Sequence, residues 1–211
     1  MDKEKKIIEV DPKDVELAGK AAPKDLAEQE PVNVANEILD WVESFVFAVF
    51  VIILIFIFLF RIVTVDGVSM NSTLEDKDRV IMSHLNYTPE RDDVVVFNSY
   101  TLNKTLIKRV IGIPGDTVKI DYNTNTVYVN GEAISNEHID SPMLDKGMFD
   151  PQYKTSDGIY EYQVPDKHIF VMGDNRNNST DSRTLGFISE DDVLGHAIFR
   201  LYPFKKIGKI D

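Results

Sequence analysis

The chain of 211 residues contains no cysteine, a single tryptophan, and far fewer basic than acidic side chains. The lack of cysteine excludes disulfide frameworks, thiolate nucleophiles and zinc sites built on cysteine. The formal net charge of −12 argues against nucleic acid as a partner, because proteins bind phosphates mainly through basic side chains. Apolar residues make up 43% of the chain, which is enough to build a core in one or two domains.

Residues 1–40 are polar and acidic. They hold eleven Asp and Glu against six Lys, three prolines interrupt them, and no apolar periodicity runs through them. We therefore predict an acidic, flexible tail over residues 1–40.

A long apolar run follows. All sixteen residues from Phe45 to Phe60 are apolar, and as a helix they would span roughly 24 Å. With their flanks, residues 41–63 reach the roughly 20 residues that cross a hydrocarbon core, and Trp41 and Arg61 suit its two interfaces. The polar flanks disfavour a buried core helix. The long acidic segment before the run, and the lack of Ala-x-Ala after it, disfavour a cleaved signal peptide. We predict one permanent transmembrane helix over residues 41–63, with the lipid bilayer as a partner.

The charges beside this helix leave its orientation open. Close to the span, Lys24 lies on the N-terminal side, against Arg61, Lys77 and Arg79 on the other. The tendency of basic loops to stay in the cytoplasm applies to short loops, and residues 64–211 form too long a segment for it.

Residues 64–211 carry short runs rich in Val, Ile, Phe and Tyr that turn residues separate, which is typical of an antiparallel β-domain. We predict strands over residues 93–97, 105–113, 117–121, 126–129, 168–172 and 196–202. The third and fourth of these form a hairpin. Residues 135–165 show little periodicity and are predicted to be a long excursion outside the main sheet. The predicted fold class is mainly β, behind one N-terminal transmembrane helix.

The histidines give no metal site, because none has a partner at the spacing of metal ligands, and no cofactor is implied. His168 and His196 lie in apolar strand patterns and are predicted to be structural. A Ser–His–Asp triad is still open, because its members need only meet in space. Asp92 and Asp93 could hold a cation, but we interpret them as a solvated strand entrance.

Ser69 and Lys108 form a further candidate pair. In the predicted strand, Lys108 shares a face with Leu106 and Val110, and apolar neighbours disfavour a charged amine. Lowering a lysine pKa from about 10.4 to about 7 takes roughly 4–5 kcal/mol, which requires a buried site. Such an amine could deprotonate the Ser69 hydroxyl. The spacing alone is more typical of a turn hydroxyl and a snorkelling lysine.

Four local strings change this assessment. In chain order they are Gly67–Leu74, Arg91–Phe97, Ile107–Asp116 and Met172–Arg183, the last followed by Gly186. They resemble the four sequence boxes of the type I signal peptidases, in the family's order and behind one anchor. The resemblance covers essentially all of residues 41–201. The short anchor and compact domain look like the Gram-positive bacterial form.

The resemblance implies a role for each matching residue. Ser69 would be the nucleophile, Lys108 the general base, and Ser179 the hydroxyl that hydrogen-bonds the lysine and orients it. The Ser69 backbone N–H would stabilise the oxyanion, a contribution of about 3–4 kcal/mol per donor. The residues implied to support the site are Met70, Arg109, Asp174, Arg176, Asp181 and Arg183. Purely structural ion pairs are the alternative for the charged residues of the last string.

Two positions depart from the usual family pattern, and a third leaves the second oxyanion donor unidentified. Ser72 stands where proline is usual, so the turn beneath the nucleophile loses a fixed φ, and Asp92 stands where glycine is usual. Gly67 stands where some relatives carry a hydroxyl donor, so the second oxyanion donor is not identified. Neither Ser72 nor Asp92 touches a reacting group, so these two departures affect local geometry more than activity.

The resemblance also implies the substrate and the location. The substrate would be the signal peptide of an exported preprotein, cut after small side chains at the first and third positions before the bond. It would bind as an extended strand. The implied substrate-binding residues are Val63, Val65, Asp66, Leu106 and Ile107. The chain would sit in the bacterial plasma membrane, with a cytoplasmic N-terminus and an extracytoplasmic catalytic domain.

Two other functions are compatible with parts of the sequence. Self-cleaving Ser/Lys repressors have a similar catalytic domain, but they are cytosolic and bind DNA, unlike an acidic, anchored chain. A catalytically inactive, membrane-anchored assembly factor is the second alternative, and Ser72 and Asp92 motivate it. The oligomeric state and the role of the acidic tail stay open.

Overall fold

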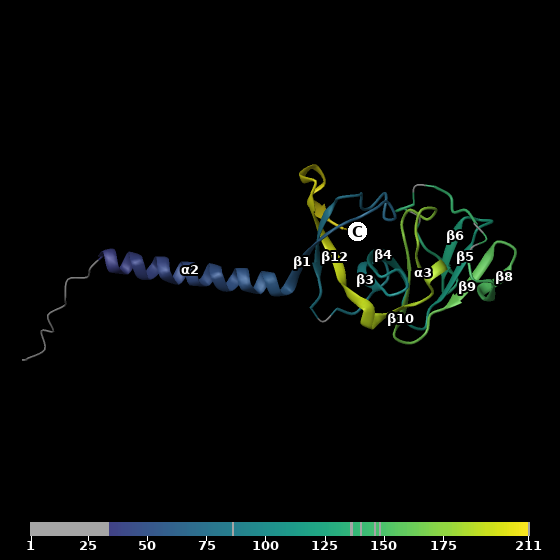
Figure 1. The fold of residues 1–211 in the computed structure, drawn as a ribbon, viewed down its shortest axis with the longest axis horizontal. Coiled ribbons are helices and arrows are strands. Elements are labelled where there is room, and N and C mark those ends of the chain that lie inside the picture. The colour runs from purple at the N-terminus through teal and green to yellow at the C-terminus, as the bar shows by residue number, and fades with distance from the viewer. Residues whose placement is uncertain are drawn as a thin grey trace, which may run out of the picture. The chain divides into compact units, whose positions relative to one another are not determined.

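The computed structural model describes residues 34–85, 87–135, 137–139, 141–145, 147 and 149–210 (Figure 1). Of the predicted tail over residues 1–40, residues 1–33 lie outside the described residues, and residues 34–40 are helical.

Helix α2 runs from Val34 to Leu59. Its stretch Glu37–Leu59 contains an 18-residue window with a mean hydropathy of 3.0 and is long and apolar enough to cross a membrane. Most of its large apolar side chains are exposed, a state that lipid stabilises and water does not.

The bounds of α2 differ at both ends from the predicted residues 41–63. The described part of the helix starts at Val34, before the predicted residue 41, and no proline or glycine interrupts residues 34–59. It ends at Leu59 because residues 60–64 form a strand, in which β-branched Ile62 and Val63 favour extended backbone.

The first sheet has eight strands in the order β1-β2-β12-β3-β4-β10-β11, with β13 paired to β12. All of its strand pairs are antiparallel. Its strands are β1 (Phe60–Thr64), β2 (Arg79–Ser83), β3 (Val94–Ser99), β4 (Lys104–Gly112), β10 (His168–Met172), β11 (Ile188–Ser189), β12 (Val193–Tyr202) and β13 (Gly208–Lys209). Short helical turns lie at Ser182–Leu185 (α3), Glu190–Asp192 (η2) and Phe204–Lys206 (η3).

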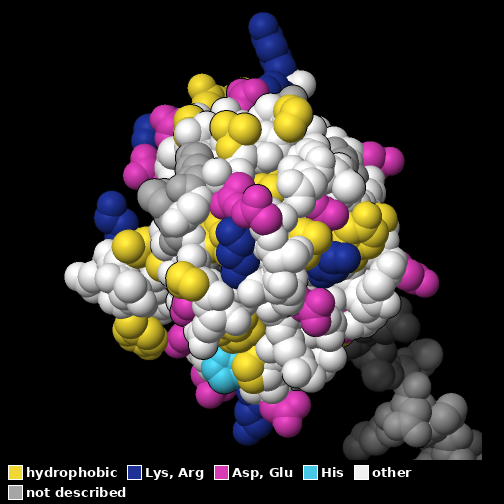
Figure 2. All heavy atoms as spheres, turned by 90° about the vertical axis from the view of Figure 1, so that its right-hand side faces the viewer, with side chains coloured by type: hydrophobic (Ala, Val, Ile, Leu, Met, Phe, Trp, Pro, Cys, Tyr) yellow, Lys and Arg dark blue, Asp and Glu magenta, His cyan; other side chains and the backbone are white. Residues whose placement is uncertain are grey.

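The second sheet has five antiparallel strands in the order β7-β6-β5-β9-β8. They are β5 (Thr117–Asp121), β6 (Thr126–Val129), β7 (Glu132–Ala133), β8 (Lys154–Ser156) and β9 (Ile159–Gln163), with a helical turn η1 at Pro151–Tyr153. The predicted β5–β6 hairpin is confirmed by its register, which pairs Val118 with Val129. On the face of this end of the domain, acidic, basic and apolar side chains are interspersed (Figure 2).

The segment 135–165 lies outside the first sheet, as predicted, but it is not irregular throughout. It supplies β8 and β9, and β9 pairs with β5 along its whole length. The alternation is short: Tyr160 and Tyr162 point into the core while Glu161 stays exposed. Because this alternation is short and lies beside turn residues, it gave little indication of a strand in the sequence.

The central strands of the first sheet are buried on both faces. Val94 and Val96 of β3 join one apolar cluster, while Val95 and Phe97 join another. This explains why β3 and β4 appear in the sequence as continuous apolar runs rather than alternating ones. Lys108 and Arg109 interrupt the β4 run and are buried in it.

Candidate active site

Ser69 lies in the loop that joins β1 to β2. Met70 beside it is fully buried, and its carbonyl accepts a hydrogen bond from the Leu74 N–H at 2.8 Å. The Asn71 N–H donates to the Val68 carbonyl at 3.2 Å. Met70 and Leu74 thus anchor the loop in the core while Ser69 stays only half-buried.

Lys108 reaches Ser69 from the neighbouring strand β4. Its Nζ lies 2.7 Å from Ser69 Oγ and donates to the Ile107 carbonyl at 2.8 Å. Only 3% of Lys108 is exposed. Burial lowers the pKa of Lys108 to about 8, against the opposing effect of Asp181 and Asp174. About a tenth of such amines are neutral at pH 7, so a proton acceptor is in contact with the Ser69 hydroxyl.

A buried ion pair between Arg109 and Asp174 supports β4 beside the lysine. The guanidinium Nε and Nη2 donate to the two carboxylate oxygens, each at 2.9 Å. Thr73, in the Ser69 loop, donates its hydroxyl to the same carboxylate at 2.6 Å. A bidentate pair of this kind fixes orientation as well as distance. It therefore holds together the Ser69 loop, β4 and the segment after β10.

A second buried pair, Arg183 with Asp181, organises that last segment. The guanidinium Nε and Nη2 donate to the two carboxylate oxygens at 2.9 Å each, and the Gly173 N–H donates to the same carboxylate at 3.0 Å. Burial raises the pKa of Asp181, but Arg183 outweighs burial, so the pKa lies below its usual value. Asp181 also caps α3 through the Arg183 N–H.

Ser179 does not make the hydrogen bond expected from it. Its Oγ is buried and makes no hydrogen bond to Lys108 Nζ among the described residues; the lysine contacts Ser69 Oγ and the Ile107 carbonyl instead. Ser179 packs instead against Gly173. A Cβ at residue 173 would lie 2.3 Å from Ser179 Oγ and 2.5 Å from the Ser69 carbonyl oxygen. Gly173 thus permits this close approach, a role that sequence reasoning did not assign.

One backbone donor suits an oxyanion. Within the described residues no hydrogen bond engages the Ser69 N–H, so it is available to a substrate carbonyl. The Gly67 N–H is already committed to Asp76 Oδ1 at 2.8 Å and does not serve as the second donor. The Asn175 N–H donates to the Ser69 carbonyl at 3.0 Å and so fixes the backbone of Ser69. Sequence reasoning did not single out Asn175.

A small cavity of about 140 Å³ opens beside Ser69. Its walls come from residues 63–66, Val96 and residues 105–108. All five predicted substrate-binding residues line it: Val63, Val65, Asp66, Leu106 and Ile107. Its small size and largely apolar lining suit a short aliphatic side chain. Val96 was missed because a buried strand residue has no sequence mark that separates a pocket wall from a core contact.

The backbone conformation at Asp92 explains why glycine is usual at this position. Its φ of 72° lies in the left-handed region that glycine adopts freely. The backbone is held there by two hydrogen bonds: Asp92 N–H donates to the Val110 carbonyl at 2.9 Å, and Arg109 Nη1 donates to the Asp92 carbonyl at 2.8 Å. Ser72, the other departure, places its hydroxyl 3.4 Å from the His138 carbonyl, to which it donates.

The two strand histidines have structural surroundings. His168 Nδ1 lies 2.8 Å from the Asp166 carbonyl. The ring of His196 stacks on Tyr87 at a centroid distance of 4.3 Å. In the described part of the chain no hydrogen bond links either ring to Ser69 or Lys108.

The sequence of the chain matches known proteins. The family described as signal peptidase, peptidase S26, matches residues 38–202. The chain belongs to this family. Family membership makes it a serine endopeptidase and confirms the resemblance inferred from the four strings.

Individual relatives cover nearly the same extent. Signal peptidase I of Bacillus amyloliquefaciens is 35% identical over 187 residues, which cover 87% of this chain and 98% of the relative. Signal peptidase IB of Staphylococcus aureus is 34% identical over 185 residues, which cover 81% of this chain and 93% of the relative. The crystal structure of a signal peptidase I from Enterococcus faecalis is similar with a TM-score of 0.41 and 30% identity, covering 52% of this chain and 97% of that one.

Proposed function

We propose that this enzyme removes signal peptides from exported preproteins, with Ser69 as nucleophile and Lys108 as general base. The observation that carries the proposal is the 2.7 Å contact between Lys108 Nζ and Ser69 Oγ. The amine is buried and its pKa is lowered to about 8. An amine in water would be protonated at neutral pH and could not accept the proton.

The reaction proceeds in two steps. Ser69 Oγ attacks the scissile carbonyl while its proton moves to Lys108 Nζ, and the Ser69 N–H donates to the resulting oxyanion. The C–N bond then breaks, the leaving amine takes the proton from Lys108, and an ester joins the signal peptide to Ser69. Water attacks this ester while Lys108 takes a proton from it, and Lys108 then gives that proton to Ser69 Oγ as the carboxylic acid leaves.

The shape of the site supports a preference for small side chains before the cut. The cavity of about 140 Å³ admits a short aliphatic group beside Ser69. Strand β1 pairs with β2 on one side and lies at the end of the strand order. An extended substrate can therefore add to its other edge, with main-chain hydrogen bonds giving affinity and the cavity giving specificity.

The anchor supports a location at the membrane. Helix α2 is long and apolar enough to span the bilayer, and Ser69 follows its end at Leu59 closely in the chain. We place the N-terminus in the cytoplasm and the catalytic domain on the outer side of a bacterial plasma membrane, where exported preproteins emerge.

The test is cleavage of a preprotein with an Ala-x-Ala site by the detergent-solubilised full-length chain. We expect cleavage after the second alanine, and its loss in Ser69→Ala and in Lys108→Met. Ser72→Ala is the matched control, because it removes a neighbouring hydroxyl that does not contact the lysine. Thermal unfolding of each variant shows whether it is folded. Cleavage by folded Lys108→Met at the wild-type rate would refute the mechanism.

A second measurement separates this function from that of an inactive assembly factor. A serine-directed acylating inhibitor should label Ser69 in the wild-type chain, and the labelled residue can be located by peptide mass spectrometry. We expect labelling to fall in Lys108→Met. A folded wild-type chain that neither cleaves nor becomes labelled would favour the inactive alternative.

A further inference from the structure

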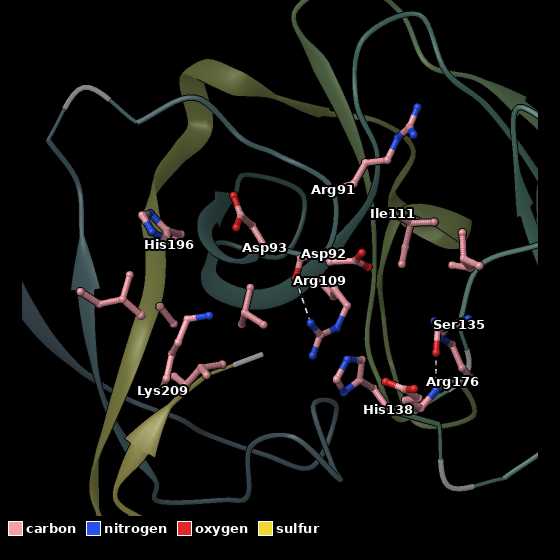
Figure 3. A pocket seen from close by; sticks show the side chains of 16 residues that line it. Arg91, Asp92, Asp93, Arg109, Ile111, Ser135, His138, Arg176, His196 and Lys209 are labelled. Carbon is pink, nitrogen blue, oxygen red and sulfur yellow. Dashed lines mark hydrogen bonds between the residues drawn. The ribbon is translucent and has the colours of Figure 1, made fainter.

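A second cavity, of about 460 Å³, lies elsewhere in the β-domain (Figure 3). Residues 91–93 and parts of β3, β4, β12 and β13 line it, together with Ile134, Ser135, Glu137, His138 and Arg176. Ser69 and Lys108 are not among its walls. Figure 3 shows Arg109 between Asp92 and His138 in this cavity. Nothing in the proposed cleavage reaction uses this space.

Arg176 is the unusual residue of this cavity. It is only 5% exposed, and its Nε has no hydrogen-bond partner in the part of the chain that the structure describes. Its Nη1 contacts Met143 Sδ at 3.6 Å, and none of its nitrogens lies within ion-pair distance of a carboxylate of the described residues. Burial, helped by repulsion from Arg183, lowers the pKa of Arg176 to about 10, so the guanidinium is still charged at neutral pH.

The neighbouring arginines are satisfied. Arg91 pairs with Asp116, Arg109 with Asp174 and Arg183 with Asp181. A buried charge is costly unless an opposite charge and hydrogen bonds compensate it. Arg176 therefore lines the cavity, and among the described residues it lacks the carboxylate that each of the other three possesses.

The other charges around the cavity limit what it can hold. Arg109 and Lys209 add positive charge, while Asp92, Asp93 and Glu137 add negative charge. Asp93 is already engaged, because its carboxylate accepts from the Tyr87 hydroxyl at 2.5 Å and from the Glu90 N–H at 3.1 Å. Asp92 and Glu137 are exposed. A polyanion would be repelled by these carboxylates, whereas a small anion can reach the arginine between them.

We infer that this cavity binds a small oxyanion, a carboxylate or a phosphate, through the guanidinium of Arg176. Both groups accept two parallel N–H donors from arginine, and such charge-assisted pairs are stronger than neutral ones. An anion that binds the folded chain but not the unfolded one raises the free energy of unfolding. Once the anion concentration exceeds the dissociation constant, this rise grows with the logarithm of the concentration.

The experiment is thermal unfolding and calorimetric titration of the full-length chain in detergent, in a buffer free of oxyanions. Sodium acetate and sodium phosphate are the probes, and sodium chloride at matched ionic strength is the reference. We expect a saturable rise in melting temperature with acetate or phosphate beyond that with chloride. A response to acetate alone assigns a carboxylate ligand, and a response to phosphate alone assigns a phosphate group.

The variants assign the effect to one side chain. Arg176→Gln should lose the saturable response, and because it removes an uncompensated buried charge it should melt no lower than the wild type without anion. Arg176→Lys keeps the charge without the forked donors and should bind about tenfold more weakly. Arg79→Gln, an exposed arginine outside the cavity, is the matched control and should respond like the wild type.

Two results would overturn the inference. One is a melting temperature of the wild type that rises no more with acetate or phosphate than with chloride at equal ionic strength, or that does not rise at all. The other is an unchanged response in both Arg176 variants. If Arg176→Gln does not fold, Arg176→Lys decides the question. Because the readout is binding, the outcome is independent of whether the chain cleaves preproteins.

Discussion

Replacement of Gly173 by alanine tests the close packing behind the nucleophile. The added Cβ would lie 2.3 Å from Ser179 Oγ, 2.5 Å from the Ser69 carbonyl oxygen and 2.6 Å from Ser179 Cβ. Since non-bonded carbon contacts are favourable at about 3.5–4.0 Å, the backbone of Ser69 or Gly173 must move by about 1 Å. A displacement of that size costs about 100-fold in rate, and the overpacking costs about 1–3 kcal/mol of stability.

The assay is kcat/KM on the preprotein together with the melting temperature. Gly208→Ala is the matched control, because a Cβ there meets nothing within 4 Å, and it should behave like the wild type. The double variant Gly173→Ala with Ser179→Gly removes the contact with the serine side chain and leaves the one with the Ser69 carbonyl. It should therefore recover stability more than activity. Wild-type kcat/KM in folded Gly173→Ala would refute this account of the site.

Three further predictions follow from the ionisable groups and the backbone. In the proposed mechanism Lys108 acts as the neutral amine, and its pKa is lowered to about 8, so kcat/KM should rise about tenfold from pH 6 to 7 and level off above about pH 8. A profile flat from pH 6 to 9 would contradict this. Asp174→Asn leaves Arg109 buried without its carboxylate and should cost about 3–5 kcal/mol in denaturant unfolding. The same change at Asp157, in an exposed pair with Lys154, should cost less than about 1 kcal/mol. Asp92→Gly relieves a φ of 72° and should raise stability by about 1 kcal/mol, whereas unchanged or lower stability would show that the backbone is not strained there.

The strands that could be predicted from sequence are those with a strong local pattern. β3 and β10 are mostly apolar runs because both of their faces are buried, and β4 is a similar run that Lys108 and Arg109 interrupt. β1 could not be separated from the helix before it, since an apolar residue such as Ile62 suits a lipid-facing helix and a strand equally well. β9 was hidden because only Tyr160 and Tyr162 mark its buried face.

The features of the site also differ in whether they could be predicted from the sequence. Ser69 and Lys108 could be predicted because they lie in strings that are distinctive by themselves, and the structure brings their reacting atoms together. The missing Ser179–Lys108 hydrogen bond, the close packing at Gly173 and the uncompensated charge of Arg176 could not. Each depends on side chains that the fold brings together from separate strands and loops.

The contacts that build the site join distant parts of the chain. Ser69 and Lys108 are 39 positions apart, Arg109 and Asp174 are 65 apart, and Thr73 and Asp174 are 101 apart. Bringing such distant segments together costs loop-closure entropy that only the finished core repays. On the proposed Ser69–Lys108 mechanism, a partly folded chain has the serine and the lysine but not the active site. Self-hydrolysis during synthesis is then prevented, because the pKa of Lys108 is lowered to about 8 only after the core has closed around it.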